Sequence, residues 1–295
     1  MYLFLTLFAG ALISLLSVIN GTLTANVGLY LTTVIIHIVA IVSAIIILAF
    51  ERKHPFPTKR LPLWMYASGL ISVCCTLCSN YAFGKISLVA ITALGLLSQT
   101  VTSLIIDHFG LLGANKRRTK AITVICLCFS LIGIVYMLGD ARLGVLSAIV
   151  ASLLAGVGLV VSRMISSTLA EHSGAVASSL INHIVGLPLA IILMFIMGKA
   201  ELAALPVSLS STPVWSYIGG FAGLMIIVIT NVVLPRVSSF QVSLLLFVGQ
   251  VFSGAAIDLL LGAGFSARTF YGGVLIALGI LAGSLFSRLK SSSQK

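Results

Sequence analysis

Long apolar runs alternate with short polar segments along the whole chain. Ten of these runs have the length of a membrane-spanning helix, for which about 20 apolar residues suffice to cross roughly 30 Å of hydrocarbon. The pattern predicts an all-α polytopic membrane protein with ten transmembrane helices. The predicted spans cover residues 2–19, 28–50, 63–83, 87–107, 121–139, 143–164, 174–198, 214–234, 238–261 and 271–289.

One of the predicted spans is repeated in the sequence. Residues 87–107 read SLVAITALGLLSQTVTSLIID and residues 238–258 read SSFQVSLLLFVGQVFSGAAID, an offset of 151 that aligns an amide with an amide and a carboxylate with a carboxylate. The register continues upstream through rare and polar residues. The aligned pairs are Gln99/Gln250, Asp107/Asp258, Pro62/Pro213, Trp64/Trp215, Gly69/Gly220 and Asn80/Asn231. A fixed-offset repeat of this kind indicates duplication of a structural unit.

The repeat predicts two five-helix halves, residues 1–140 and 143–290. Because five is odd, two copies of one unit must cross the bilayer in opposite orientations. Basic residues favour cytoplasmic segments, and with both termini cytoplasmic thirteen of the seventeen Lys and Arg residues fall on that side. Arg163 is counted among them because the sixth span is predicted to end at residue 164. The outer side holds Lys85, Arg142, Lys199 and Arg268.

Inverted repeats are typical of secondary transporters, with a substrate site near the bilayer midplane. The sequence therefore predicts a carrier of a small metabolite or drug-like solute that works by alternating access and is not an enzyme. Two alternatives stay open. The first is a non-transporting scaffold or channel, which has no need of the paired polar residues found inside these spans. The second is a membrane-embedded lipid-modifying enzyme, which would gather its acid and base at one depth, whereas the two carboxylates of the repeated span are expected toward opposite faces of the membrane.

The motif at the end of the fourth span resembles a known family. Residues 99–110, QTVTSLIIDHFG, are followed by Leu111-Leu112-Gly113 and a basic loop, and this run is similar to the YdcZ family of inner-membrane exporters in the drug/metabolite transporter superfamily. The resemblance implies a ten-helix bundle in which helices 1–4 and 6–9 surround a central cavity. It also implies an inner-membrane location and outward transport. Small multidrug transporters of that superfamily carry a glutamate in helix 1, which this first span lacks.

Four polar residues fall near the middle of predicted spans. His37 and His183 occupy matching positions at an offset of 146, and imidazoles titrate near neutral pH, so the pair is the best candidate for proton coupling. The alternative is a neutral histidine bonded to a facing helix. Gln99 and Gln250 offer donors and acceptors either to a solute or to the opposite repeat.

The remaining candidates are asparagines and aspartates. Asn20, directly after the first span, and the pair Asn80 and Asn231 are candidates for the substrate pathway, although the position of the pair favours a role in tying the tight links that follow. Asp107 and Asp258 are predicted to lie toward opposite mouths of the pathway. There they act either as gates or coupling groups or as anchors bonded to helix ends or basic side chains.

Composition sets limits on cofactors and partners. The net charge of +11 sits in short loops beside apolar spans, where it meets headgroups, and does not predict nucleic-acid binding. The five cysteines lie in apolar spans, and no metal or other cofactor is expected. Expected partners are a small-molecule solute, the lipid bilayer and protons or another coupling ion, in a monomer or homodimer. Without a fixed charge near the midplane, the prediction favours a neutral, zwitterionic or cationic solute.

Overall fold

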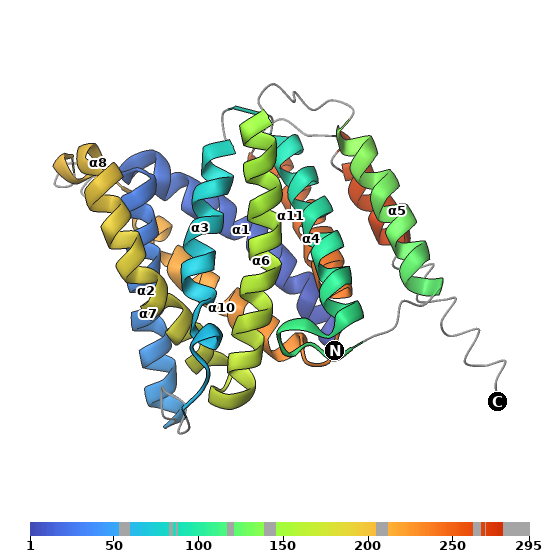
Figure 1. Cartoon of the computed structure of the whole chain (residues 1–295). Helices are drawn as coiled ribbons and strands as arrows, with labels where there is room; N and C mark the ends of the chain where they lie inside the picture. The colour runs from blue at the N-terminus through green and yellow to red at the C-terminus, as the bar shows by residue number, and fades with distance from the viewer. Residues whose placement is uncertain are drawn as a thin grey trace. The chain divides into compact units, whose positions relative to one another are not determined.

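The computed structural model describes residues 1–52, 60–82, 85–86, 88–116, 121–138, 146–204, 212–261, 267–268 and 270–279. The regular elements in these ranges are helices (Figure 1). Six of them are long and apolar enough to cross a membrane, and three more are shorter apolar helices. The predicted all-α class and the membrane-spanning character are therefore confirmed.

Most of the helices follow the predicted spans closely. The bounds are α1 Tyr2–Val27, α2 Leu29–Glu51, α3 Ser68–Ala82, α4 Leu88–Phe109, α5 Ala121–Leu138, α6 Leu146–Ser173, α7 Ala175–Met197, α8 Lys199–Ala203, α10 Gly219–Val233 and α11 Ser239–Leu261. Short 3₁₀ helices η1 Leu63–Tyr66, η2 Leu111–Gly113 and η3 Val214–Ile218 adjoin α3, α4 and α10. The last described apolar helix is Phe270–Gly279.

Two helices are much longer than predicted. The first span was expected to end at residue 19 and the sixth at residue 164, but α1 reaches Val27 and α6 reaches Ser173. Polar residues suggested these ends, yet their side chains bond back to the carbonyl one turn earlier, as Thr22 does to Val18 and Thr168 to Met164. Such bonding satisfies a hydroxyl without ending the helix.

Sharp turns at two glycines follow these long helices. Gly28 between α1 and α2 has φ +87°, and Gly174 between α6 and α7 has φ +89°. Only glycine adopts this backbone conformation without strain. The two glycines stand at equivalent positions of the repeat, so each half turns from its first helix into its second in the same way.

The described chain divides into two compact units. Unit 1 contains residues Met1–Ala11, Cys75–Val160 and Pro235–Lys295, and unit 2 contains Leu12–Cys74 and Val161–Leu234. Each unit draws on both halves of the sequence. Helices α1, α3 and α6 contribute one part of their length to each unit.

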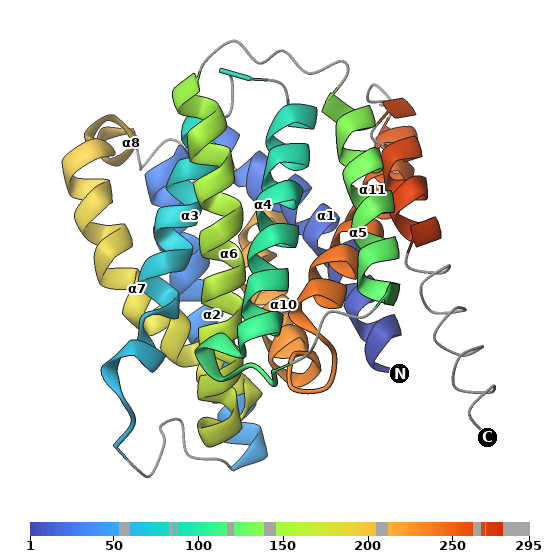
Figure 2. The same ribbon diagram turned by 45° about the vertical axis from the view of Figure 1, so that its right-hand side comes forward.

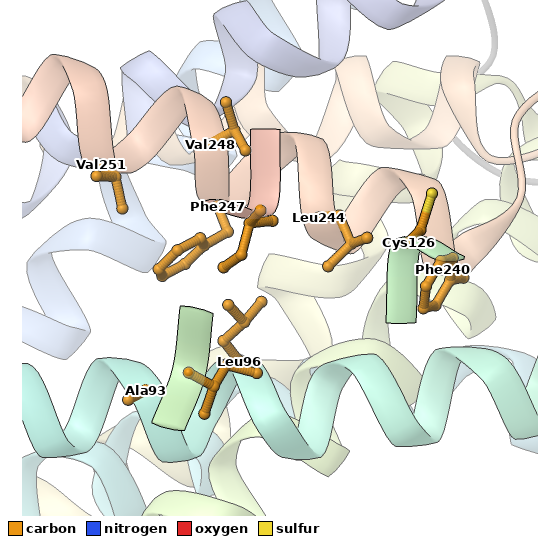
Figure 3. Packing of buried hydrophobic residues seen from close by; sticks show 10 residues of the cluster. Ala93, Leu96, Cys126, Phe240, Leu244, Phe247, Val248 and Val251 are labelled. Carbon is orange, nitrogen blue, oxygen red and sulfur yellow. The ribbon is translucent and has the colours of Figure 1, made fainter. Parts of the chain in front are cut away.

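Unit 1 is built on the pair α4 and α11, with α5 packed against α4. Phe247, Leu244 and Val251 of α11 face Leu96 and Ala93 of α4 across an apolar core (Figure 3). Cys126 and Ile134 of α5 and Ile276 of the last helix extend this core. The pairing matches the sequence, because α4 and α11 carry the two copies of the repeated span.

Unit 2 is built on the pair α2 and α7, with α10 packed against both (Figures 1 and 2). One apolar cluster joins Leu31 and Val34 of α2 to Ala190 of α7, and another joins Ala44 of α2 to Leu224 of α10. Here again the central pair consists of the two helices that correspond at an offset of 146.

Candidate functional site

His37 and His183 lie against each other inside unit 2. Their ring centroids are 5.1 Å apart with an interplanar angle of 78°, an edge-to-face contact. The residues are 7% and 5% exposed. Each stands eight residues into its helix, about 12 Å from the start at 1.5 Å per residue. The structure therefore brings together the two histidines that the sequence paired.

The two histidines differ in their hydrogen bonding. His37 Nδ1 donates to the carbonyl oxygen of Thr33 at 2.8 Å, because a carbonyl can only accept. In the described part of the chain, His37 Nε2 and both ring nitrogens of His183 are buried without a hydrogen-bond partner. Unpaired buried polar atoms cost free energy. The histidine site therefore retains ring nitrogens whose hydrogen-bonding capacity is not used within the folded chain.

A glycine makes room for the imidazole of His37. A Cβ on Gly186 of α7 would lie 2.6 Å from His37 Nε2 and 3.0 Å from its Cδ2. Beside His183 on the same helix, Asn182 is 2% exposed and Ser179 fully buried, and Asn182 Oδ1 and Ser179 Oγ lack partners within the described ranges. Asn182 was not among the sequence candidates, although its position in the polar run SSLINH of an apolar helix could have identified it.

Asn20 and Asn231 also belong to unit 2, at separate points. Asn20 Oδ1 is buried and abuts Gly219 at the start of α10. Asn231 is 3% exposed, and its Nδ2 donates to the carbonyl oxygen of Ala175 at 3.3 Å. Asn231 therefore ties α10 to the first turn of α7. The side chain of its repeat partner Asn80 lies outside the described residues.

Serine hydroxyls join neighbouring helices around this region. Ser162 of α6 donates to the carbonyl oxygen of Ser68 at 2.9 Å and lies 2.8 Å from the hydroxyl of Ser72 on α3. Ser178 of α7 donates to the carbonyl oxygen of Ser166 on α6 at 2.6 Å. Interhelical bonds of this kind are modest stabilisers inside membranes. The sequence did not single out these serines, because serine is common in spans and carries no pairing signal.

Gln99 and Gln250 lie on α4 and α11, the central pair of unit 1. Both are partly buried, and both take part in interactions with other residues. One turn further along α4, Ser103 lies 2.8 Å from Ser243 of α11, hydroxyl to hydroxyl. The two glutamines therefore stand on helices that polar as well as apolar contacts hold together.

Asp107 binds the start of α11. Its Oδ1 accepts from the backbone N–H of Ser239 at 3.0 Å and its Oδ2 from that of Phe240 at 2.8 Å. The aspartate is 6% exposed. The amino terminus of a helix has unpaired N–H groups and a positive dipole end, so this carboxylate anchors α4 to α11. The side chain of Asp258 lies outside the described residues.

Glu201 makes a long-range contact that the sequence did not indicate. It lies in the short helix α8. Its Oε1 accepts from the N–H of Leu29 at 3.0 Å and its Oε2 from that of Leu31 at 2.8 Å. The carboxylate caps the amino terminus of α2 from a residue about 170 positions away, which no local pattern could indicate.

Replacing Glu201 with alanine is expected to destabilise the protein by about 1–2 kcal/mol, because the first N–H groups of α2 lose their acceptor. The measurement is the midpoint of a heating series, scored by the monodisperse peak of the purified protein in detergent. Glu171→Ala, which removes an exposed acid, is the matched control. Equal midpoints for the two variants would contradict the cap.

Arg163 occupies an unexpected position. It was counted with the cytoplasmic end of the sixth span, but α6 continues for ten residues beyond it to Ser173. The predicted end of the sixth span at residue 164 is therefore wrong, whereas the cytoplasmic assignment of Arg163 stays a prediction. Arg163 stands close to the middle of the helix and is partly buried.

The sequence model of the family described as "Putative inner membrane exporter, YdcZ" matches residues 1–136 and again residues 147–285. The chain belongs to this family. The resemblance stated from the motif at residues 99–110 is thereby confirmed.

Two further comparisons complete the picture. A solved structure described as "Crystal structure of protein" superposes with a TM-score of 0.68 at 16% identity, covering 97% of this chain and 96% of the other. At that identity the likeness shows a shared fold alone. No curated protein matches the chain.

Membership of the YdcZ family makes the chain a multi-pass protein of the inner membrane and points to a transporter rather than an enzyme. Among the described residues, no group of three His, Cys, Asp or Glu side chains could hold a metal ion. The five cysteines, all within the described parts of α3 and α5, form no disulfide.

Proposed function

We propose that this YdcZ-family protein is a secondary transporter that moves a small solute outward across the inner membrane by alternating access. In this proposal ten spans form two inverted five-helix repeats, residues 1–140 and 143–290, with both termini in the cytoplasm. The observation that carries the proposal is that helix contacts come in pairs related by the repeat.

The clearest pair lies in unit 2. The backbone of Gly69 on α3 abuts Asn182 and Gly186 of α7, and the backbone of Gly220 on α10 abuts Ile36 and Ala40 of α2. The glycines correspond at an offset of 151 and their partners at 146. Each contact is thus the copy of the other, as expected where a two-fold axis relates the halves.

Unit 1 contains a second pair. The backbone of Gly10 on α1 abuts the carbonyl oxygen of Leu246 on α11, and that of Gly156 on α6 abuts the carbonyl oxygen of Gly95 on α4. Gly10 and Gly156 again correspond at 146, and Gly95 and Leu246 at 151. Both units therefore support the same internal symmetry.

In this proposal the two-fold axis passes through the contact between His37 and His183 in unit 2. That contact is its own copy, because each histidine is the repeat equivalent of the other. An axis in the membrane plane relates two halves that face opposite sides, and exchange of their conformations converts an inward-open carrier into an outward-open one. The two shapes then have similar energies, as alternating access requires.

The pathway in this proposal includes Gln99 and Gln250, the two histidines, Asn20, Asn80 and Asn231. Their amides and imidazoles can bond a solute without a permanent acid. The histidine pair serves as a proton site, since its free nitrogens can accept protons but two adjacent imidazolium charges would repel each other. Asp107 and Asp258 stand near opposite mouths, where movement of a capped helix end would gate the pathway.

The test is solute flux into proteoliposomes with clamped pH, using a panel of metabolites and amines. We expect saturable transport that falls about 5- to 150-fold in Gln99→Ala/Gln250→Ala, since two lost bonds to the solute, at about 0.5–1.5 kcal/mol each, cost about 1–3 kcal/mol together. His37→Phe/His183→Phe should retain flux and lose proton coupling. Asn26→Ala, which removes an exposed amide of α1, is the matched control.

Other results would favour the alternatives. Absence of tracer flux for every solute would overturn the transport proposal in favour of a scaffold. Flux that never saturates would indicate a channel. A chemical change in the lipid that depends on the two histidines would indicate an enzyme.

A further inference from the structure

Equivalent stretches of α1 and α6 are covered to different extents. Residues 164–169 of α6 are all buried, each at most 8% exposed. In the equivalent residues 18–23 of α1, Ile19 and Leu23 are buried, whereas Gly21 is exposed and the other three are partly exposed. Identical conformations of the two repeat copies would cover these stretches alike. The two halves of unit 2 therefore pack differently here.

The more tightly packed half contains a serine junction, which consists of Ser68 and Ser72 of α3 and Ser162 of α6. Ser162 donates to the carbonyl oxygen of Ser68 at 2.9 Å, and its own oxygen lies 2.8 Å from that of Ser72. On the next turn of α6, the carbonyl oxygen of Ser166 accepts from Ser178 of α7 at 2.6 Å. These bonds hold the first turns of α3 and α7 against the later half of α6.

The equivalent junction between α10 and α1 is open. Gly223 of α10 is the repeat equivalent of Ser72, and Leu16 of α1 is that of Ser162. A Cβ on Gly223 would have no heavy atom of another helix within 4 Å, so Leu16 does not touch this position. The contact that closes one half of unit 2 is therefore not made by the equivalent residues of the other half.

The open position at Gly223 lies on the buried side of α10. Gly219, Gly220 and Thr230 share that side at spacings of four, three and seven residues, and all three are buried. Phe221 is 45% exposed and lies about 200° around the helix from Gly223, at 100° per residue. The space beside Gly223 is therefore on the side of α10 that packs against protein and not on its exposed apolar side.

Repeat symmetry separates fixed contacts from changing ones. When the two halves exchange conformations, a contact made in both copies is kept, whereas a contact made in one copy is lost there and forms in the other. The backbone contacts of Gly69 with α7 and of Gly220 with α2 occur in both copies, so they belong to the fixed part. The serine junction belongs to the changing part. The turn at Gly28 has no counterpart to compare, because the segment equivalent to α8 lies outside the described residues.

A contact between α1 and α10 provides a pivot for this change. Asn20 Oδ1 abuts Gly219, one turn from the open position. Tilting α1 about this contact would carry Leu16, four residues before Asn20, toward the space at Gly223. Glycines at both positions of α10 present no side chain that would obstruct the approach.

We propose that the serine junction is the closed gate of the transport pathway and that the opposite gate closes when Leu16 packs against Gly223. This inference rests on the proposed transport function and identifies its moving contacts. With both termini in the cytoplasm, the serine junction lies toward the cytoplasm and the equivalent junction toward the outside. The described conformation then faces outward. Hydrogen bonds between helices are individually weak in membranes, so the serines can separate in every cycle.

The first experiment cross-links cysteine pairs in the full chain, reconstituted in proteoliposomes after its five native cysteines are replaced by alanine. One pair is Ser72→Cys/Ser162→Cys, at the junction that is closed. The other is Leu16→Cys/Gly223→Cys, at the equivalent junction that is open. A copper–phenanthroline oxidant forms the disulfides, and mass spectrometry of the linked peptides measures their amount.

The matched control for the cross-linking is Ser103→Cys/Ser243→Cys, because those hydroxyls also lie 2.8 Å apart, within unit 1. We expect the serine-junction pair to link as fast as this control, and its disulfide to stop solute flux until a reductant is added.

The pair at the open junction should link more slowly. We expect Leu16→Cys/Gly223→Cys to react at least about tenfold more slowly than the control, because a minor conformation is about 0.1–10% populated. A disulfide holds two Cβ atoms about 3.8 Å apart, closer than these two positions are in the described conformation. Adding Ser72→Ala and Ser162→Ala should speed this link, because the closed gate then loses its bonds.

Gly223→Leu tests the same gate by filling the open space. We expect this variant to keep at least the wild-type heating midpoint, since the new side chain begins where no other helix is in contact. Solute flux should fall about 5- to 150-fold, equivalent to about 1–3 kcal/mol of overpacking against Leu16 in the second conformation. Phe221→Leu, on the exposed side of the same helix, is the matched control and should keep the full rate.

The outcomes distinguish this inference from the function on which it rests. A Leu16→Cys/Gly223→Cys pair that never links while the control pair does, or flux unchanged in Gly223→Leu, would overturn the gate and leave transport intact. If Gly223→Leu fails to fold, the cross-linking pairs decide the question. Links in both junctions without flux of any solute would support the two conformations and overturn the transport function.

Discussion

Leucine in place of Gly220 should destabilise the protein by at least about 3 kcal/mol, beyond the usual 1–3 kcal/mol for overpacking. A Cβ there would collide with the carbonyl oxygen of Ile36 and lie 2.8 Å from the backbone nitrogen of Ala40. These atoms belong to the backbone of α2, so no side-chain rotation can relieve the collision. The helices α2 and α10 would have to separate, which would open the core around Leu224 and Ala44.

The control for this prediction is on the same helix. A Cβ on Gly223, almost one turn after Gly220, would have nothing within 4 Å. Gly223→Leu should therefore change stability by no more than about 1 kcal/mol, and in the favourable direction, because leucine forms helix better than glycine. The heating midpoints of the two purified variants decide the comparison, and similar midpoints would contradict the close packing of α10 on α2.

The repeat extends the prediction to a third glycine. Gly69 of α3 contacts the backbone of α7 as Gly220 contacts α2. Gly69→Leu should therefore cost about as much as Gly220→Leu, at least about 3 kcal/mol. A tolerated Gly69→Leu would weaken the proposed symmetry while leaving the packing of α10 untouched.

The sequence predicted the helices well because hydrophobic length is a strong signal in membranes. Backbone groups in lipid must be paired within the segment, so an apolar run of sufficient length is a helix. The pairing of His37 with His183 could also be predicted from the sequence. Two matching positions on equivalent helices meet wherever those helices pack on each other, as α2 and α7 do.

The ends of the helices were harder to predict from the sequence. Polar residues after Ile19 and around Arg163 indicated that the spans had ended, yet α1 and α6 continue for eight and nine residues beyond the expected limits. Asparagine, threonine and serine side chains can hydrogen-bond the backbone carbonyl one turn earlier and so remain within a helix. Here Asn26 donates to Thr22 one turn earlier, so the helix continues through a polar stretch.

This error concealed Arg163. An arginine at the end of a span is an ordinary orientation signal, whereas the same residue near the middle of a helix is a candidate ligand. The expectation of a neutral, zwitterionic or cationic solute depended on the absence of a fixed charge near the midplane. Arg163 stands close to the middle of α6, and the solute preference stays a prediction for measurement to decide.

Contacts between distant residues could not be predicted from the sequence, for a different reason. The cap of Glu201 on α2 and the bridge from Ser103 to Ser243 join residues far apart in the chain. Neither glutamate nor serine has a pairing preference that identifies its partner. Only the packing of the helices decides which donor each oxygen meets.

Replacing Asp107 with alanine should destabilise the protein by about 2–5 kcal/mol. The carboxylate accepts from the N–H groups of Ser239 and Phe240, and a buried donor left unpaired costs about 1–3 kcal/mol. Asp107→Asn should cost less, because one oxygen still accepts while the charge at the helix terminus is lost. Heating midpoints measure both variants, with Glu171→Ala as the exposed-acid control.

The same variants also test whether Asp107 acts as a gate. If the carboxylate is only an anchor, folded Asp107→Asn should transport at the wild-type rate, whereas a gate would show an increased leak in the absence of solute. The repeat further predicts that Asp258 caps the start of α4, where Leu88 and Val89 correspond to Ser239 and Phe240. Asp258→Ala should then lower the midpoint as Asp107→Ala does. A loss confined to Asp107 would mean that the two halves have diverged at their caps and that only one mouth retains this contact.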